Sequence, residues 1–258
     1  MRFAPLRHKT IVITRPKEQA EHLAELIQSS GGEALIFPAI EIRDPAETET
    51  LDARIDRLDD FDLAIFISPT AVTKAMERVS QRRALPSTLK IAAIGQGSAR
   101  ELNRLGVNDV LVPATRFDSE ALLDLPAMQQ MRGKRVIIFR GEGGRALLAE
   151  TLKKRGATVD YAECYRRACP DTPVSELLQR GWKNEIHGIV ITSSEGMHNL
   201  HDMIGESGAA WLKSTPVFVS HPKIEQVGRK LGLTRLIVAE GGDEAMLQSI
   251  IDNVANSS

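Results

Sequence analysis

The sequence repeats itself at an offset of 125 residues, the distance that separates Arg15 from Arg140. Around these arginines, "IVITRPKEQAEHLAELIQSSGG" (11–32) runs in step with "VIIFRGEGGRALLAETLKKRGA" (136–157) through an apolar run, a helix-like stretch and a glycine. The same offset aligns "LAIFISPTAV" (63–72) with "GIVITSSEGM" (188–197) and "IAAIGQGSARELNRLGV" (91–107) with "PVFVSHPKIEQVGRKLGL" (216–233). At nearly the same distance, "DSEALL" (118–123) resembles "DEAML" (243–247). Agreement over several separate stretches indicates an internal duplication, so we expect two related halves.

Each half alternates short apolar runs with amphipathic stretches. The apolar runs are "TIVIT", "ALIF", "LAIFI", "IAAI" and "DVLV" in the first half, and "RVIIF", "TVDYA", "GIVIT", "PVFV" and "RLIVA" in the second. Continuous β-branched runs are typical of parallel strands that are covered on both faces. The stripe from Ala20 to Ile27 has helical spacing, and Gly31 and Gly156 stand where helices should end. We therefore predict an α/β protein with two doubly wound, flavodoxin-like parallel sheets.

The domain boundary has two readings. A cut near "QQMRGK" (129–134) gives two contiguous domains. However, "LIFPAIEIR" (35–43) is too long for one buried strand and carries Pro38 in its middle, where a ladder donor is lost. Its repeat partner "VDYAECYRR" (159–167) overruns in the same way, so the two extensions could instead pair as a two-stranded connector between interleaved domains. The residues alone leave both partitions open.

The bulk composition excludes several classes of protein. Lys and Arg (33) nearly cancel Asp and Glu (34), so no global field attracts nucleic acid or an anionic membrane. The spacing of Cys164 and Cys169 fits neither a redox pair nor a zinc knuckle, which indicates a reducing compartment. The sequence shows no apolar signal segment and no long apolar run. We expect a cytoplasmic protein.

Ligands of open parallel sheets bind outside the carboxyl ends of the strands, so the turns that follow the apolar runs are the candidate site. These turns are "TRP" (14–16), "SPTA" (68–71), "GQGS" (95–98), "RGEGG" (140–144), "TSSEG" (192–196), "SHPK" (220–223) and "EGGDE" (240–244). They are rich in Gly, Ser and Thr, and each opens a helix whose free N–H groups attract anions. The dinucleotide, P-loop and nucleophile-elbow motifs are missing. The turns therefore predict two rims for a large ligand with several carboxylates or phosphates.

Each candidate residue also has a structural reading. Four serines, Ser68, Ser98, Ser193 and Ser194, are placed to cap helix N-termini. Arg15 and Arg140 could bind the ligand, or could pair with neighbours such as Glu18 and Glu142. Tyr165 could donate a hydrogen bond to the ligand, or could serve only in packing.

The ordered series "ITRPKEQAEHLAELIQSSGGEALIFPAIEI", "FDLAIFISPTAV", "IAAIGQGSARELNRLGV", "VIIFRGEGGRALLAETLKKRGATVDYAECYRR" and "GIVITSSEGM" resembles the uroporphyrinogen-III synthase family, from about residue 9 to about residue 254. The resemblance implies the interleaved partition. The expected parts are residues 1–38 with 169–258 as one α/β domain, residues 44–160 as the second, and residues 39–43 and 161–168 as a two-stranded antiparallel connector.

The resemblance also implies an activity. Enzymes of this family cyclise hydroxymethylbilane to uroporphyrinogen III, with loss of water and inversion of the last pyrrole ring, and use no metal or organic cofactor. The bound molecule would be this linear tetrapyrrole. We expect a monomer that meets the enzyme supplying hydroxymethylbilane only transiently. The competing hypothesis is a non-catalytic, two-domain cytosolic protein that binds a small polyanion.

By family likeness, Tyr165 is the expected catalytic residue and donates a hydrogen bond to the leaving oxygen. The expected substrate-binding residues are Arg15, Ser68, Gly95, Ser98, Arg140, Ser193, Ser194 and Ser220. No acid–base dyad is needed in this reaction, because holding the substrate in one conformation is catalysis by orientation.

Overall fold

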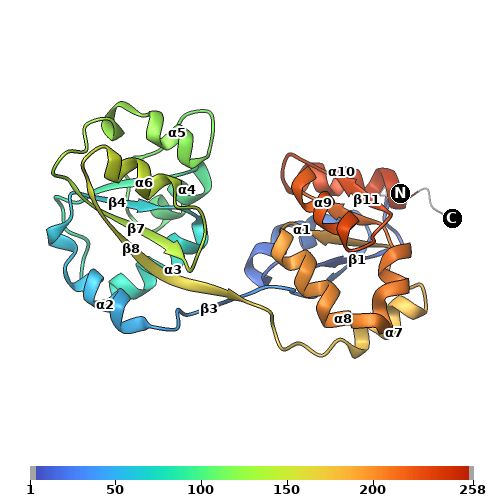
Figure 1. Ribbon diagram of the computed structural model, residues 1–258. Coiled ribbons are helices and arrows are strands. Elements are labelled where there is room, and N and C mark those ends of the chain that lie inside the picture. Colours follow the sequence, from blue (N-terminus) through green and yellow to red (C-terminus); the bar gives the residue numbers. More distant parts are fainter. Residues whose placement is uncertain (1–3, 256–258) are drawn as a thin grey trace. The chain divides into compact units, whose positions relative to one another are not determined.

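A computed structural model describes residues 4–255 (Figure 1). The chain divides into two compact units. The terminal unit contains the residues up to Glu41 together with those from Ala168 onward, and the central unit contains Ile42–Arg167. The chain therefore leaves the terminal unit after Glu41 and returns to it at Ala168.

The terminal unit has a five-stranded sheet in the order β2-β1-β9-β10-β11, and its pairs are parallel. Its strands are β1 (Thr10–Ile13), β2 (Glu33–Ile36), β9 (Gly188–Ile191), β10 (Val217–Val219) and β11 (Leu236–Val238). Its helices are α1 (Lys17–Ser29), α7 (Ser175–Trp182), α8 (Ser194–Ser214), α9 (Pro222–Lys230) and α10 (Asp243–Val254). The apolar side chains of α1 and α10 cover one face, and those of α7, α8 and α9 cover the other.

The central unit has a six-stranded sheet in the order β3-β8-β7-β4-β5-β6. Its strands are β3 (Glu41–Arg43), β4 (Leu63–Phe66), β5 (Lys90–Ala93), β6 (Val110–Leu111), β7 (Arg135–Gly141) and β8 (Thr158–Ala168). Its helices are α2 (Thr48–Asp56), α3 (Pro69–Ser80), α4 (Gln96–Arg104), α5 (Ser119–Asp124) and α6 (Leu147–Lys154), with short 3₁₀ turns at Leu58–Asp60 and Pro126–Met128. From β8 to β6 the pairs are parallel.

The two sheets have the same spatial plan although the chain threads them differently. At the repeat offset, β7 and β8 correspond to β1 and β2, while β4, β5 and β6 correspond to β9, β10 and β11. Numbered by this correspondence, both sheets contain the order 2-1-3-4-5, which is the flavodoxin-like arrangement, and the central sheet has β3 in addition at its edge beside β8. The prediction of doubly wound parallel α/β sheets is confirmed.

The long apolar run around Pro38 is split between the two sheets. β2 ends at Ile36, and β3 begins at Glu41 beside β8 in the other sheet. Proline fixes φ and lacks an N–H group, so a break at this point costs the first sheet no ladder donor. The repeat partner of this run has no proline, and β8 continues without a break for 11 residues.

Alternation along β7 sends side chains to two opposite cores in the central unit. Val136 and Ile138 face the layer of α5 and α6, whereas Ile137 and Phe139 face the layer of α2, α3 and α4. In the second layer, the rings of Phe139 and Phe66 stack with their centroids 4.8 Å apart. This packing fixes the ends of β7 and β4 relative to each other, and the candidate site lies just beyond those ends.

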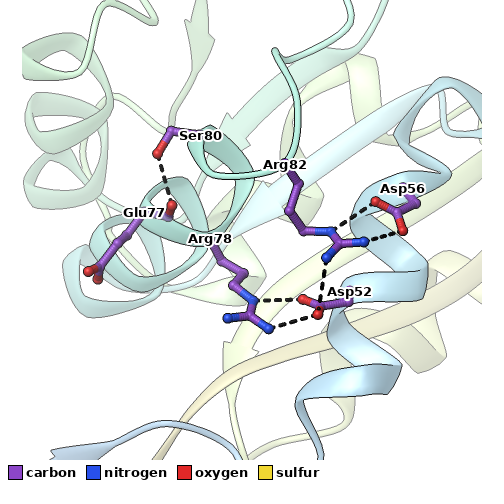
Figure 2. Close-up of polar contacts among 6 residues, drawn as sticks. All are labelled: Asp52, Asp56, Glu77, Arg78, Ser80 and Arg82. Carbon is purple, nitrogen blue, oxygen red and sulfur yellow. Dashed lines mark hydrogen bonds and ion pairs between the residues drawn. The ribbon is translucent and has the colours of Figure 1, made fainter.

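Ion pairs hold α2 against α3 on the same face of the sheet (Figure 2). The Arg78 guanidinium donates two hydrogen bonds of 2.7 Å to Asp52, and Arg82 bridges Asp56 and Asp52. The hydrogen bond from Arg78 is the main cause that lowers the pKa of Asp52 below its ordinary value. Arg78 lies in the last turn of α3 and Arg82 lies just after its end, so these pairs orient the helix whose N-terminus opens at the candidate site.

Within residues 4–255, no helix is both long and apolar enough to cross a membrane.

Candidate functional site

Four of the candidate residues lie at the points where the strand orders reverse, and Gly95, Ser98 and Ser220 follow the next strands along, β5 and β10. In the terminal unit this switch point lies between β1 and β9, which are followed by Arg15 and Ser193. In the central unit it lies between β7 and β4, where Arg140 ends one strand and Ser68 follows the other. Open α/β sheets bind their ligands at this position, because the chain connections diverge there and leave the strand ends uncovered.

Two of the four predicted helix caps are confirmed. Ser68 accepts a hydrogen bond from the Ala71 amide at 3.0 Å, and Ser193 accepts one from the Gly196 amide at 2.9 Å. The prediction is wrong for Ser98, the third residue of α4, and for Ser194, the first residue of α8. In both turns the N-cap is an earlier residue, Gly95 before α4 and Ser193 before α8.

Gly95 and Ser220 occupy matching turns but play different parts. Gly95 is the N-cap residue of α4, and a side chain at this position would meet Phe117 at 3.2 Å. The hydroxyl of Ser220 donates to the Thr192 carbonyl at 3.4 Å, while the cap of α9 is His221, whose Nδ1 accepts from the Lys223 amide. Ser220 therefore links two neighbouring turns of the terminal unit.

Arg140 is only 5 % exposed and has no acidic partner among the described residues, since no carboxylate lies within ion-pair distance. Its Nε donates to the Gly141 carbonyl at 3.1 Å, and the guanidinium lies 4.6 Å from the centre of the Tyr161 ring. Glu142, the neighbour considered as its partner, instead accepts from the Ala46 amide at 3.0 Å. Burial of a cation without an anion is unfavourable, so this arrangement suits a ligand that brings the negative charge.

The loop after β7 closes over the guanidinium. Gly144 has φ +94°, and a Cβ there would lie 2.5 Å from a terminal nitrogen of Arg140. A residue with a side chain would be strained at this φ and would also displace the arginine. Gly144 in "RGEGG" therefore lets the loop pass next to the charge.

Arg15 has the opposite environment. Its Nη1 lies 2.5 Å from Oδ1 of Asp243, and both side chains are mostly buried, with 14 % and 16 % of their surfaces exposed. The other oxygen of Asp243 lies 3.1 Å from Nδ1 of His22. The partner of Arg15 is thus Asp243 rather than Glu18, and the charge of Arg15 is already compensated within the protein.

Tyr165 lies at the edge of the central core. Its side chain is only 3 % exposed, and its hydroxyl lies 3.4 Å from the Ser68 hydroxyl, where either group can donate. The ring rests on the backbone of Gly141, where an added Cβ would come within 2.7 Å of two ring carbons. Ser68 is half-buried, whereas the Tyr165 side chain that contacts it is buried.

Two contributors were not predicted from the sequence. Asp243 stands 228 positions from Arg15 and meets it only because α10 packs beside α1. Tyr161 stacks on Arg140 from the adjacent strand, and its position two places after Val159 on the same face of β8 was the available signal. Within residues 4–255, no group of three or more His, Cys, Asp or Glu side chains is arranged to hold a metal ion.

The fold and the strand ends define a class: a duplicated α/β protein with an arginine and a serine-capped helix at the switch point of each sheet. A family model described as "Uroporphyrinogen-III synthase HemD" matches residues 21–248. The chain belongs to the uroporphyrinogen-III synthase family.

Individual relatives agree with this assignment. The chain is 32 % identical to the uroporphyrinogen-III synthase of Escherichia coli K12 over 93 % of its own length and 99 % of the relative. It is 39 % identical to the Proteus mirabilis protein of the same name over 68 % of its own length and 88 % of the relative. Among solved structures, a mutant uroporphyrinogen III synthase from Thermus thermophilus has the same fold, with a TM-score of 0.63 and 17 % identity over 96 % of this chain and all of the other.

Proposed function

We propose that this chain converts hydroxymethylbilane to uroporphyrinogen III, acting as a lyase in tetrapyrrole biosynthesis. Support comes from the family match over residues 21–248 and from curated relatives that carry the name of this activity. The structural observation that carries the proposal is Arg140, a buried guanidinium without a carboxylate, which immediately precedes Gly141, the residue that contacts the ring of Tyr165. The substrate has many carboxylates, which suits a site that lacks its anion.

The proposed substrate-binding residues supply either a side chain or backbone N–H groups at a helix N-terminus. They are Arg15, Ser68, Gly95, Ser98, Arg140, Ser193, Ser194 and Ser220. In this proposal Arg140 binds a carboxylate directly, whereas the amides at the starts of α3, α4 and α8 bind others through the positive ends of the helices. Arg15 contributes less charge, because Asp243 already accepts from it.

Tyr165 and Ser68 would act on the leaving group. The C–O bond of the hydroxymethyl group breaks, its electron pair leaves with the oxygen, and the Ser68–Tyr165 pair supplies the proton that converts that oxygen to water. The proton that the pyrrole ring releases on closure restores the pair. The Ser68 hydroxyl accepts from the Ala71 amide and can accept from the phenol, which leaves its own proton free to donate toward the leaving oxygen. Tyr165 then acts with Ser68 as one hydrogen-bonding unit.

Control of substrate conformation is the second part of the proposed mechanism. Loss of the hydroxyl leaves a reactive azafulvene that closes spontaneously to the symmetric isomer. The protein must hold the last pyrrole ring so that it closes inverted, and this is a task of orientation rather than of proton transfer. Several fixed donors on rigid strand ends are suited to it.

The product isomer tests the function. Purified protein is supplied with freshly made hydroxymethylbilane, and the products are oxidised and separated by chromatography. We expect the III isomer to dominate, against the I isomer alone in a control without protein. A reaction that yields only the I isomer, even though the protein binds hydroxymethylbilane, would contradict catalysis and favour the non-catalytic alternative.

The compartment and the partner are part of the same proposal. Within residues 4–255, neither Cys164 nor Cys169 forms a disulfide bond, as is usual in a reducing compartment such as the cytoplasm. Because free hydroxymethylbilane closes without help, we expect a monomer that receives it through brief contact with the enzyme that makes it. Sedimentation of the protein with and without that enzyme tests this expectation.

A further inference from the structure

The strand that carries Tyr165 shifts its register just before the tyrosine. β7 and β8 pair residue by residue from Arg135 opposite Thr158 to Arg140 opposite Glu163, but Gly141 then lies opposite Tyr165. One residue of β8, Cys164, is left without a counterpart. This is a β-bulge, which re-aims the side chains that follow it.

The bulge decides which face of the sheet receives the phenol. Val159 belongs to the core under α5 and α6, whereas Ala162 belongs to the core under α2, α3 and α4. Strict alternation would send Tyr165 to the Val159 face. In the structure Tyr165 instead joins Ala162 and Cys164 on the other face. This is the face against which α3 packs, and Ser68 is the N-cap of α3.

The Cys164 thiol connects the bulge to β7 and to α3. Its Sγ donates to the Arg140 carbonyl at 3.2 Å and lies 3.6 Å from the carbonyl of Ala71. The amide of Ala71 donates to the hydroxyl of the cap residue Ser68. The side chain is only 2 % exposed. Burial raises the pKa of this thiol to about 12, so its S–H remains available as a donor at any working pH.

Gly141 provides the space that the re-aimed ring needs. Its missing side chain lets the Tyr165 ring lie against the backbone, and the next amide, that of Glu142, donates to the Tyr165 carbonyl at 2.8 Å. The bulge, the Cys164 thiol and Gly141 therefore all contribute to the orientation of the Tyr165 ring.

We propose that Cys164 is a positioning residue for Tyr165: as the bulged residue it turns the phenol toward Ser68, and its thiol fixes that turn to Arg140 and Ala71. This inference rests on the proposed function for its catalytic consequence. Its structural half, the orientation of Tyr165, stands independently of any activity.

The test compares Cys164→Ala with Cys164→Ser in the full-length protein. Alanine removes the donor, and we expect kcat for the III isomer to fall about tenfold with little change in KM, because a small misplacement of a reacting group mainly affects the chemical step. Serine restores a donor of similar size, so it should recover most of kcat. Gly141→Ala should lower kcat further, because its Cβ enters the space of the Tyr165 ring.

A spectroscopic measurement separates this inference from the proposed function. The chain has two tyrosines, so labelling with [ζ-¹³C]tyrosine gives two resonances, and Tyr165→Phe identifies the one from Tyr165. We expect Cys164→Ala and Gly141→Ala to shift the Tyr165 resonance and Cys164→Ser to leave it close to its original position. This readout does not require turnover, so it remains valid even if the protein makes no III isomer.

A destabilised control excludes a merely structural effect. Leu152→Ala opens a cavity under the opposite face of the same sheet and should lower stability without moving the Tyr165 resonance or kcat at temperatures where the protein is folded. The inference is overturned if Cys164→Ala leaves the Tyr165 resonance and kcat unchanged, or if Cys164→Ser alters both as strongly as alanine does.

Discussion

Arg15 and Arg140 are repeat partners at the switch points of two matching sheets, yet only Arg15 has an ion-pair partner among the described residues. The difference originates in another repeated pair, Asp118 and Asp243. Asp118 caps α5 by accepting from the Ala121 amide at 2.6 Å, so it does not reach Arg140. Asp243 lies one place further into its helix, after the cap residue Gly242, and reaches Arg15. A shift of one residue at a helix start therefore decides which arginine is free to bind a ligand.

The serine-capped turns differ in the same direction. Ser68 in the central unit has the Tyr165 hydroxyl 3.4 Å away. The repeat partner of Tyr165 is Ile40, and a Cβ on Gly196, the residue that Ser193 caps, would lie 3.5 Å from the end of the Ile40 side chain. The duplication has preserved the geometry of both turns while only one keeps a hydroxyl beside its serine. We therefore expect the central unit to act on the leaving group. The terminal unit should bind the substrate mainly through the backbone amides at its helix N-termini.

The largest expected effect comes from the paired positions Tyr165 and Ile40. Tyr165→Phe removes a donor that acts on the leaving group, so kcat should fall about 100-fold while substrate binding changes little. Ile40→Val should lower stability by about 1 kcal/mol and leave kcat near the wild-type value. Steady-state kinetics with isomer analysis measures both. Equal losses of kcat in the two variants would abolish the distinction between the units.

The two arginines should separate binding from stability. Arg140→Met removes a charge-assisted bond to substrate, and we expect kcat/KM to fall about 30-fold. Because no protein carboxylate loses a partner, the stability of the central unit should not decrease. Arg15→Met should have a much smaller kinetic effect but should destabilise its unit by about 2 kcal/mol, since Asp243 loses its ion-pair partner in a largely buried place.

The chain offers a separate probe for each unit in this measurement. Both tryptophans, Trp182 and Trp211, belong to the terminal unit, and both tyrosines belong to the central unit. Tryptophan fluorescence in urea therefore follows the effect of Arg15→Met, and the tyrosine ¹³C resonances follow that of Arg140→Met. A matching loss of stability in both would show that Arg140 has a partner within the protein after all.

Much of this comparison could be predicted from the sequence, because its signals are local. Apolar runs and glycine-rich turns follow from backbone chemistry within a few residues, and the 125-residue offset doubles each signal, as Arg15 and Arg140 show. The same logic predicted Ser68 and Ser193 as caps, and failed at Ser98 and Ser194. In "GQGS" and "TSSEG" the earlier residue fits the backbone equally well, and composition cannot choose between them.

The remaining features depend on long-range geometry. The Arg15–Asp243 pair requires that the packing of α10 on α1 be known, and these elements come from opposite ends of the chain. The bulge at Cys164 leaves no mark in composition, because an inserted residue in a strand looks like any other strand residue until the partner strand is placed. The sequence therefore does not predict, in either unit, whether the arginine at the strand end has an ion-pair partner.

Removal of the caps should give equal structural effects and unequal kinetic ones. Ser68→Ala and Ser193→Ala each lose one hydrogen bond to a helix amide, so each should cost about 1 kcal/mol in its own unit. Only Ser68→Ala should also lower kcat, by about tenfold. In this variant the Tyr165 phenol no longer has the Ser68 hydroxyl through which it acts on the leaving oxygen.

A double variant makes this prediction decisive. If Ser68 and Tyr165 act as one unit, Ser68→Ala should reduce kcat far less in a Tyr165→Phe background than in the wild type. Independent, multiplying effects in the double variant would show that the two hydroxyls do not cooperate, and the assignment of Ser68 as the link between Tyr165 and the leaving oxygen would be wrong.

The smallest expected effect concerns acid sensitivity at the other end of the two sheets. The first amide of β1, that of Thr10, donates to Nδ1 of His187 at 3.1 Å, and the matching amide of β7, that of Arg135, donates to Asp62 at 2.9 Å. Burial, with a contribution from Lys9, lowers the pKa of His187 from 6.5. The hydrogen bonds from Lys134 and from the Arg135 amide lower the pKa of Asp62.

These two acceptors lose their contribution in different pH ranges. The folded state favours neutral His187, so its contribution is present above the unfolded pKa of 6.5 and declines as the pH falls through that value. The contribution of Asp62 persists until the pH falls below the ordinary value of 3.8 for that carboxyl. Between about pH 7.5 and about pH 5.5, only the terminal unit should therefore weaken through this position.

His187→Asp tests this difference by giving the terminal unit the acceptor of the central unit. In wild type, the urea midpoint from tryptophan fluorescence should drop between about pH 7.5 and about pH 5.5, and the aspartate variant should show a smaller drop over the same range. His22→Asn is the matched control, because it removes a histidine of the same unit that lies far more exposed, at 57 %. If His22→Asn flattens the response as much as His187→Asp does, the acid sensitivity belongs to the Arg15–Asp243 cluster at the strand ends instead, and the contrast between the units returns to that site.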